Sequence, residues 1–334
     1  MRRPTLHDVA AEAGVSIKTV SRVVNDAANV SPEVRQRVER VIEELHYVPN
    51  TLARSLKAGR GDTIGVVIDT IADPFFASLT SAVEERALAE GLGTVFGSTG
   101  FDAQRERAQV ERMAMQRVRA LILAPTQGPH DYLRRFETSF PMVMIDRKVA
   151  IDGYDTVRVD DVGLARRAIT HLVDHGHRRI AFVGSDERFV TTRDRLTGYR
   201  EALAEVGVEP SESWIRPGPT RDVDAAAVTI ELLALTEPPT AIFAANPRAA
   251  IGVAHALHTR DRADIAFVSF GDFPLARTLR PGVTVVDQNP AAIGLTAMDR
   301  VLVRLTDDLV GEPADIVVEA ALLARGSGEI GVAS

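Results

Sequence analysis

The sequence TLHDVAAEAGVSIKTVSRVV, residues 5–24, decides the fold of the amino-terminal part of this chain. Thr5 and Asp8 have the spacing of a capping box, in which the Thr hydroxyl accepts a hydrogen bond from the Asp backbone N–H and the Asp carboxylate reaches back. Gly14 can take the left-handed conformation that ends a helix, and Ser16 is a good N-cap for the next one. The stretch therefore predicts a helix-turn-helix, whose second helix fits the major groove of B-DNA.

The next residues predict a third helix that completes a small amino-terminal domain. Ser31-Pro32 combines an N-cap with the proline favoured at the first helical position, and apolar residues recur at helical spacing from Val34 to Leu45. We therefore expect one compact three-helix unit over residues 1–49. Asn50 can cap a further helix within residues 50–60, but so short a helix is not stable alone.

The charge of the chain changes sign at about residue 60. Residues 1–60 hold ten Lys and Arg against seven Asp and Glu, whereas the remainder holds 29 against 39. A mildly basic head before an acidic body is typical of a nucleic-acid-binding module attached to a domain that must not itself adhere to phosphate.

Length and composition favour a cytoplasmic protein of about two domains. The chain has 334 residues, of which 45% are apolar and 25% charged, and it has no cysteine, which excludes disulfides, thiolate catalysis and cysteine-ligated metals. No stretch approaches 18 uninterrupted apolar residues, and the first residues run into an amphipathic helix in place of a signal sequence. We expect neither a membrane span nor export.

The head resembles the DNA-binding domain of the lactose-repressor/galactose-repressor (LacI/GalR) family. The matching pieces are Thr5-Leu6-x-Asp8-Val9-Ala10, Ala13-Gly14-Val15-Ser16, Thr19-Val20-Ser21-Arg22-Val23-x-Asn25, Val30-Ser31 and Tyr47-x-Pro49-Asn50-x-x-Ala53-Arg54-x-Leu56. The resemblance implies that residues 50–60 fold on DNA as a hinge helix. The DNA-binding residues that it implies are Thr5, Ser16, Ile17, Lys18, Thr19, Ser21, Arg22, Asn25, Asn50, Ala53, Arg54 and Leu56.

The chemistry of these side chains agrees with such a role. Arg22 can donate two hydrogen bonds to guanine O6 and N7, Lys18 can reach guanine acceptors, and Ile17 offers only apolar contact, for example to a thymine methyl group. Leu56 inserted in the minor groove would unstack a base step and kink the duplex. The alternative is a solvated helix face in a small protein–protein module.

From residue 63 onward, short apolar runs alternate with helical segments in two series. The runs are 64–68, 94–96, 120–123 and 142–145, then 180–183, 214–215, 241–244, 265–268 and 283–286. Continuously apolar strands separated by helices predict parallel sheets covered on both faces. We expect an α/β body, residues 61–334, of two doubly wound lobes. Their boundaries are about 61–159 with 289–317, and about 160–288 with 318–330.

Polar and aromatic residues follow these strands where apolar periodicity would not place them. Ligands of open parallel sheets bind beyond the carboxyl ends of the strands. Aromatic rings stack on the apolar faces of a sugar, while carboxylate, guanidinium and amide groups bond its hydroxyls in pairs. The candidate effector-binding residues are Asp73, Phe75, Phe76, Asp146, Arg147, Arg195, Asn246, Asp272 and Gln288.

The body also resembles the sugar-sensing core of the LacI/GalR family, which is similar to type I, ribose-type periplasmic sugar-binding proteins. The matching pieces include Pro74-Phe75-Phe76, Ile145-Asp146-Arg147, Arg195-Leu196-x-Gly198-Tyr199, Ala244-x-Asn246 and Val285-x-x-Gln288. By that similarity the effector contacts are Asp146, Arg147, Arg195, Asn246, Asp272 and Gln288.

Three departures from the family pattern leave the effector itself open. Pro247 stands where the family usually has Asp, and Ser269-Phe270-Gly271-Asp272 replaces Gly-Phe-Asp-Asp. Residues 218–221 lack the aromatic that many relatives place there. The effector contacts implied by the family carry two negative and two positive charges, so a neutral ligand leaves no buried charge uncompensated. We expect a neutral sugar or polyol.

Other interpretations of the same residues are structural. Asp146, Arg147 and Arg195 could form an ion-pair network between the lobes, and Phe75-Phe76 could be plain core.

A histidine cluster has a structural interpretation too. His171, His175 and His177 have metal-ligand spacing, but cations at a helix C-terminus explain them. We expect no metal and no cofactor.

The expected function is transcriptional regulation without catalysis. No G-x-x-x-x-G-K, G-x-S-x-G or H-E-x-x-H motif is present, which argues against an enzyme. We expect a repressor that binds a palindromic operator as a homodimer and responds to the effector. The alternatives are an activator or corepressor-dependent regulator of the same family, and a solute receptor, which the head and the missing signal sequence oppose.

Overall fold

The computed structural model describes residues 4–24, 29–47, 61–218, 221–306 and 311–332. The chain forms two compact units, Met1–Gly61 and Asp62–Ser334. None of the helices within the described ranges combines the length and the hydropathy that crossing a bilayer requires.

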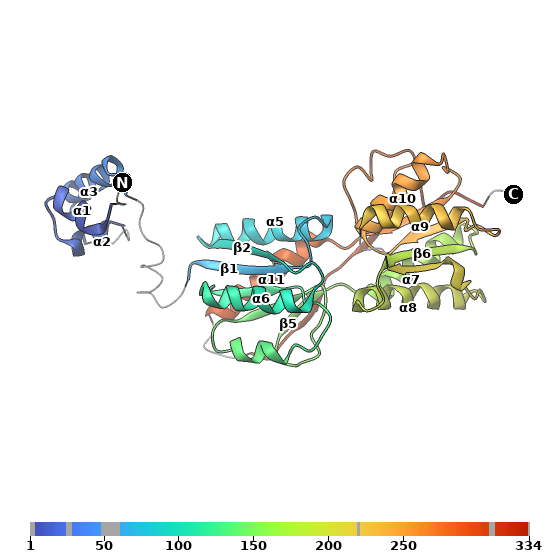
Figure 1. Cartoon of the computed structure of the whole chain (residues 1–334), viewed down its shortest axis with the longest axis horizontal. Coiled ribbons are helices and arrows are strands. Elements are labelled where there is room, and N and C mark those ends of the chain that lie inside the picture. The colour runs from blue at the N-terminus through green and yellow to red at the C-terminus, as the bar shows by residue number, and fades with distance from the viewer. Residues whose placement is uncertain (1–3, 25–28, 48–60, 219–220, 307–310, 333–334) are drawn as a thin grey trace. The chain divides into compact units, whose positions relative to one another are not determined.

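The first unit contains the three predicted helices (Figure 1), α1 (Leu6–Glu12), α2 (Ile17–Val24) and α3 (Pro32–Glu44). Both halves of the predicted capping box are present at Thr5 and Asp8, and Gly14 has a φ of 64°. Side chains from all three helices form one core, which buries the apolar face of each short helix. The core residues are Val9, Ala10, Ala13, Val20, Val23, Val38, Val41 and Tyr47.

Some predicted DNA-binding residues lie outside the described residues. These are Asn25, Asn50, Ala53, Arg54 and Leu56, and with them the expected hinge helix.

The second unit contains two six-stranded sheets, each with helices on both faces. The first sheet is entirely parallel, with strand order β11-β5-β4-β3-β1-β2. Helices α5 and α11 pack together against it, and α6 packs against β1 and β2. Its elements are β1 (Thr63–Ile68), α5 (Pro74–Ala89), β2 (Gly93–Ser98), α6 (Ala103–Met115), β3 (Ala120–Leu123), η1 (Asp131–Phe136), β4 (Met142–Ile145), β5 (Asp155–Arg158), α11 (Pro290–Thr306) and β11 (Asp315–Val317).

The second sheet has the order β12-β10-β9-β8-β6-β7, and only its edge strand β12 is antiparallel among the described strands. Figure 1 shows α9 and α10 on one side of this sheet and α7 and α8 on the other. Its elements are α7 (Asp161–Asp174), β6 (Ile180–Ser185), α8 (Val190–Glu205), η2 (Glu212–Trp214), β7 (Ile215–Gly218), α9 (Asp222–Leu233), β8 (Ala241–Ala244), α10 (Pro247–Thr259), β9 (Ala266–Phe270), β10 (Thr284–Asp287) and β12 (Ala321–Leu323).

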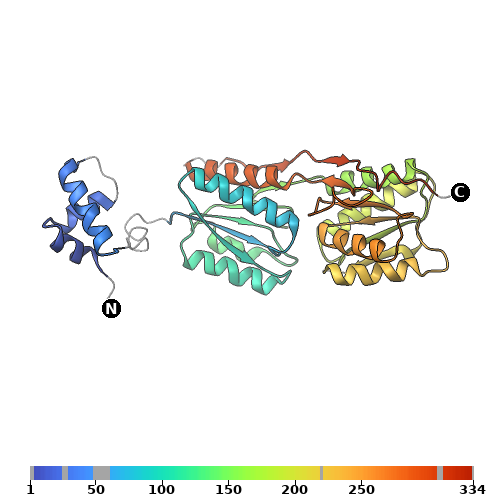
Figure 2. The same ribbon diagram turned by 90° about the horizontal axis from the view of Figure 1, so that it is seen from above.

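The chain passes between the two sheets after β5, after β10 and after β11 (Figure 2). Each predicted apolar run lies in or overlaps a strand, and β3, β4 and β8 are buried at every position. Strands β5, β11 and β12 were not predicted from the sequence. These three strands are short and carry charged or exposed residues, so they lack the apolar run on which the prediction depends.

Candidate functional site

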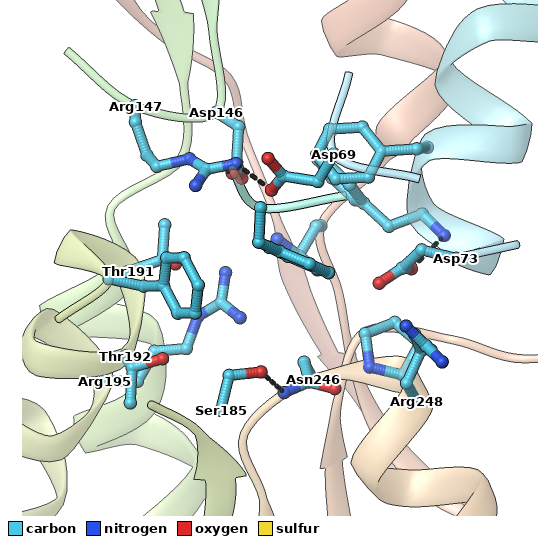
Figure 3. A pocket seen from close by; sticks show the side chains of 16 residues that line it. Asp69, Asp73, Asp146, Arg147, Ser185, Thr191, Thr192, Arg195, Asn246 and Arg248 are labelled. Carbon is cyan, nitrogen blue, oxygen red and sulfur yellow. Dashed lines mark hydrogen bonds and ion pairs between the residues drawn. The ribbon is translucent and has the colours of Figure 1, made fainter. Parts of the chain in front are cut away.

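A cavity with about 550 Å³ of empty space, including its open mouth, lies between the two lobes of the second unit. Its walls come from the carboxyl ends of parallel strands in both sheets and from the helices that follow them (Figure 3), where ligands of such sheets bind. The lining residues are Asp69, Asp73, Phe75, Phe76, Phe101, Asp146, Arg147, Ser185, Phe189, Thr191, Thr192, Arg195, Asn246, Pro247, Arg248 and Gln288.

All the predicted effector-binding residues line this cavity except Asp272. The other residues that line it were not predicted as effector contacts. Asp69 and Ser185 end apolar strands, so the rule used for the others would have found them. Phe101, Phe189, Thr191, Thr192 and Arg248 lie several residues past a strand, where no periodicity marks them.

Arg147 is held by two carboxylates of its own lobe. Arg147 Nη2 donates to Asp69 Oδ2, and Arg147 Nε lies 3.0 Å from Asp146 Oδ2, in ion-pair contact but without hydrogen-bond geometry. Burial raises the pKa of Asp69, and the Arg147 charge opposes that rise. Asp146 has a φ of 67°, a strained conformation for a residue with a side chain and one that is common at binding sites.

Arg195 is held in the same way within the other lobe. Its Nε donates to Asp161 Oδ1 at 2.7 Å, its Nη1 donates to the Ala245 carbonyl at 2.7 Å, and its guanidinium lies 4.0 Å from the ring centroid of Phe270. Burial raises the pKa of Asp161 to about 6, although Arg195 opposes the shift. The predicted alternative is an ion-pair network between the lobes, whereas the ion pairs found for Arg147 and Arg195 among the described residues each lie inside one lobe.

Aromatic rings from both lobes wall the cavity. Phe75 and Phe76 form an edge-on pair with centroids 5.0 Å apart, and they belong to the core as well as to the cavity wall. Phe101 and Phe189 meet across the lobes with centroids 5.2 Å apart. The cavity thus offers apolar faces beside its charged groups, as a site for a polyhydroxylated ring requires.

Two predicted amide side chains differ in how they are engaged. Asn246 Oδ1 accepts from Ala249 N at 2.9 Å as the N-cap of α10, and Asn246 Nδ2 donates to Ser185 Oγ at 3.1 Å. Gln288 is buried, and no hydrogen bond of its side-chain amide occurs within the described part of the chain.

Asp272 is engaged elsewhere, which corrects its predicted place in the cavity. Its carboxylate receives two hydrogen bonds from Arg325, at 2.9 and 2.6 Å. Asp272 lines a neighbouring hollow beside the amino-terminal end of α5, and this hollow shares Phe75 and Gln288 with the cavity. The two hydrogen bonds from Arg325 hold the carboxylate at this hollow, which Gly271 also lines.

The three histidines singled out by spacing are bonded to protein groups. His171 Nε2 contacts Glu329 Oε1 at 2.5 Å, and His175 Nδ1 contacts the His171 carbonyl at 2.8 Å. His177 is bonded to Thr240 Oγ1 and to the Ile330 carbonyl.

In the first unit, α2 presents the predicted base-contacting residues to solvent. Ile17, Lys18 and Arg22 are exposed, while Val20 and Val23 of the same helix are buried. Of the other described DNA-binding candidates, Thr5, Ser16 and Thr19 lie at helix starts and Ser21 lies within α2. Thr5 donates to Asp8 Oδ2, Ser16 Oγ accepts from Thr19 N and contacts Thr19 Oγ1, and Ser21 is half-buried.

Two family models match successive parts of the chain. Residues 5–50 match the model of bacterial regulatory proteins of the lacI family, and residues 61–313 match periplasmic binding proteins and the sugar binding domain of the LacI family. The division between the matches falls where the two compact units meet.

Individual relatives agree with the family models. The chain is 35% identical to the HTH-type transcriptional regulator CelR of Thermobifida fusca, over 98% of this chain and 99% of the relative. It is 31% identical to the ribose operon repressor of Escherichia coli, over 97% and 99%. A crystal structure of the Lac repressor dimer bound to operator and the anti-inducer ONPF superimposes with a TM-score of 0.83 at 27% identity, covering 98% of this chain and 99% of that one. This chain is a DNA-binding transcriptional regulator and belongs to the LacI family.

Proposed function

We propose that this regulator is a repressor that binds a palindromic operator as a homodimer and is controlled by a small neutral sugar or polyol bound between its lobes. One observation supports the effector proposal most directly. The cavity contains paired carboxylates and guanidinium groups, and aromatic rings form part of its walls. Hydroxyl groups both donate and accept, so they match carboxylates and guanidinium groups together.

The charge of the cavity supports a neutral ligand. The lining contains three aspartates, Asp69, Asp73 and Asp146, and three arginines, Arg147, Arg195 and Arg248. A phosphorylated sugar would add negative charge to a site without a surplus of cations, and its buried charge would be costly.

The relatives support the same proposal. One solved relative, 30% identical to this chain, is described as a CelR–cellobiose complex, and a curated relative is named the ribose operon repressor. Both names refer to a sugar or a sugar operon. The dimer in the solved Lac repressor complex likewise supports a homodimer on DNA.

We assign the parts of the chain as follows. Residues 1–49 bind DNA, residues 50–60 form the hinge, and residues 61–334 bind the effector and dimerise, with one lobe of about 61–159 and 289–317 and another of about 160–288 and 318–330. The DNA-contacting and effector-contacting residues are those predicted from the sequence, apart from Asp272. The protein acts in the cytoplasm by binding alone, without catalysis.

A thermal-shift panel tests the effector proposal on the full chain. The panel comprises D-ribose, D-glucose, D-galactose, cellobiose, myo-inositol, glucose 6-phosphate, galacturonate and hypoxanthine. A ligand at 100 times its dissociation constant adds roughly 2.7 kcal/mol to the stability of the folded state. We expect a neutral sugar or polyol to raise the melting temperature and to change operator affinity in a gel-shift titration. Stabilisation only by glucose 6-phosphate, galacturonate or hypoxanthine contradicts the proposal.

A further inference from the structure

Arg248 is a cavity residue whose charge no hydrogen bond or ion pair neutralises. It is the second residue of α10, it is half-buried, and it lines the cavity. Among the described residues no hydrogen bond or ion pair to its guanidinium is found, and its charge acts to lower the pKa of the Asp73 and Asp224 carboxyl groups. A cation at a helix N-terminus is opposed by the helix dipole. The position therefore favours a further group that accepts hydrogen bonds from Arg248.

The other arginines of the cavity are already engaged. Arg147 is held by Asp69 and Asp146, and Arg195 by Asp161 and a backbone carbonyl. Of the three, Arg248 has all of its N–H groups available to a ligand.

Asp73 belongs to the other lobe and faces Arg248 across the cavity (Figure 3). Asp73 Oδ1 accepts from Phe75 N at 2.9 Å as the N-cap of α5, and no hydrogen bond to Asp73 Oδ2 is found in the described ranges. Asp73 is 8% exposed. The two opposite charges influence each other, yet no ion pair joins them among the described residues, so a ligand in the cavity that both line can bond to both.

Asn246 is a weaker candidate for that role because both ends of its side-chain amide are occupied. Oδ1 caps α10, and Nδ2 bonds Ser185. Pro247 has no backbone N–H to offer. The first residue of α10 that can reach a ligand with free donors is therefore Arg248.

We propose that Arg248 and Asp73 bind two adjacent hydroxyl groups of the neutral effector, one residue from each lobe. The guanidinium donates hydrogen bonds to both hydroxyl oxygens, and Asp73 Oδ2 accepts a hydrogen bond from one of the two hydroxyl groups. A carboxylate or phosphate would satisfy Arg248 but would repel Asp73, so this pair selects an uncharged vicinal diol. The inference rests on the proposed function, and it names the residues that determine effector class.

The test compares effector binding by the full-length variants Arg248→Gln, Arg248→Lys and Asp73→Asn. The probe is the neutral sugar of the panel that binds the wild type best, and its dissociation constant is measured by isothermal titration calorimetry. Arg260→Gln is the matched control, since Arg260 is an exposed arginine at the other end of α10 and outside the cavity. We expect Arg248→Gln and Asp73→Asn each to weaken binding about 10- to 100-fold, the usual effect of hydrogen bonds to charged groups. The sugar affinity of Arg248→Lys should lie between those of Arg248→Gln and the wild type, because lysine keeps the positive charge and loses the planar guanidinium.

Monodeoxy analogues of the same sugar identify the hydroxyls involved. A deoxy analogue that lacks one bonded hydroxyl should bind the wild type poorly and should lose little further affinity in Arg248→Gln. Circular dichroism of the unliganded variants verifies that each is folded.

The outcomes separate the two proposals. Equal sugar binding by wild type and Arg248→Gln overturns the role of Arg248 and leaves the sugar effector intact. Tighter binding of galacturonate or glucose 6-phosphate than of any neutral sugar, abolished in Arg248→Gln, overturns the selection of a diol and the neutral effector together. If no sugar or polyol binds the wild type, both proposals are wrong.

Discussion

At the scale of single residues, Asp73 shows how a binding site can reduce stability. Burial raises the pKa of Asp73 to about 6 from 3.8. The folded protein therefore binds this proton more tightly than the unfolded chain, and ionisation removes stability as the pH rises from about 4 to about 6. The same carboxylate caps α5, which stabilises the fold. Its cap therefore contributes stability, whereas its buried charge reduces stability.

The first prediction concerns the variant Asp73→Asn. Asparagine caps a helix as well as aspartate does and carries no charge. At pH 7.5 we expect the variant to be more stable than the wild type by about 1–3 kcal/mol in urea denaturation, a difference that vanishes below about pH 4. Asp102→Asn is the control, because Asp102 caps α6 from an exposed position and should change stability by under about 0.5 kcal/mol at either pH. Equal stability of wild type and Asp73→Asn at pH 7.5 contradicts the prediction.

A second prediction concerns the pair of Asp272 and Arg325. Loss of the carboxylate leaves Arg325, whose side chain is 12% exposed, without its two hydrogen bonds. Asp272→Ala should therefore lower stability by about 1–3 kcal/mol, while the affinity for the effector stays within about threefold, or about 0.7 kcal/mol. Denaturation and calorimetry on the same preparation check both parts. Retained stability with lost sugar binding would restore Asp272 as an effector ligand.

At the scale of helices and strands, the loop after β9 packs closely against two cavity residues, Pro247 and Gln288. A Cβ atom on Gly271 would lie 2.6 Å from Pro247 Cγ and 3.0 Å from Gln288 Oε1, and Gly271 has a φ of 99°. Gly271→Ala should thus lower the free energy of unfolding by about 2 kcal/mol more than Gly207→Ala does. Gly207 also has a positive φ, of 69°, but open space surrounds its Cβ position. Similar unfolding free energies for the two variants would show that the loop shifts to accept the methyl group.

The exposed face of α2 leads to a prediction about operator binding. Arg22→Ala should weaken binding to the cognate operator by about 1–3 kcal/mol, and it should relax the preference for one base at one operator position. Arg40→Ala, from the exposed face of α3, is the control for the loss of positive charge. Fluorescence anisotropy with single-base operator variants measures both effects. A uniform loss on every sequence would assign Arg22 to a phosphate instead.

Elements with strong local signals could be predicted from the sequence, and the remainder could not. The capping box at Thr5 and the buried run of β3 each carry a physical signature within a few residues. By contrast, β11 is a short edge strand whose place depends on pairing with β5, far away in the sequence.

The same limit applies to the cavity. Asp146 and Gln288 could be predicted because they follow apolar strands. Arg248 could not, since its role depends on Asn246 being bonded elsewhere and on Asp73 lying across the cavity.

At the scale of the whole molecule, the oligomeric state is the remaining prediction. The proposed function includes a homodimer on the operator, which the solved Lac repressor dimer bound to operator supports. We therefore expect a dimer. Sedimentation velocity at micromolar concentration should show one dominant dimeric species, and a dominant monomer or tetramer would contradict this.

The three passages between the lobes also set the order in which the protein can assemble on the ribosome. The head closes its core within the first 47 residues, so it can fold early in synthesis. The first sheet needs β11, and α11 covers three of its strands, so that lobe stays incomplete until residue 317 has emerged. The second lobe waits for β12, only a few residues later. Both lobes therefore finish almost together once residue 323 has emerged, and a nascent chain that terminates before that point carries a folded DNA-binding head without a completed effector domain.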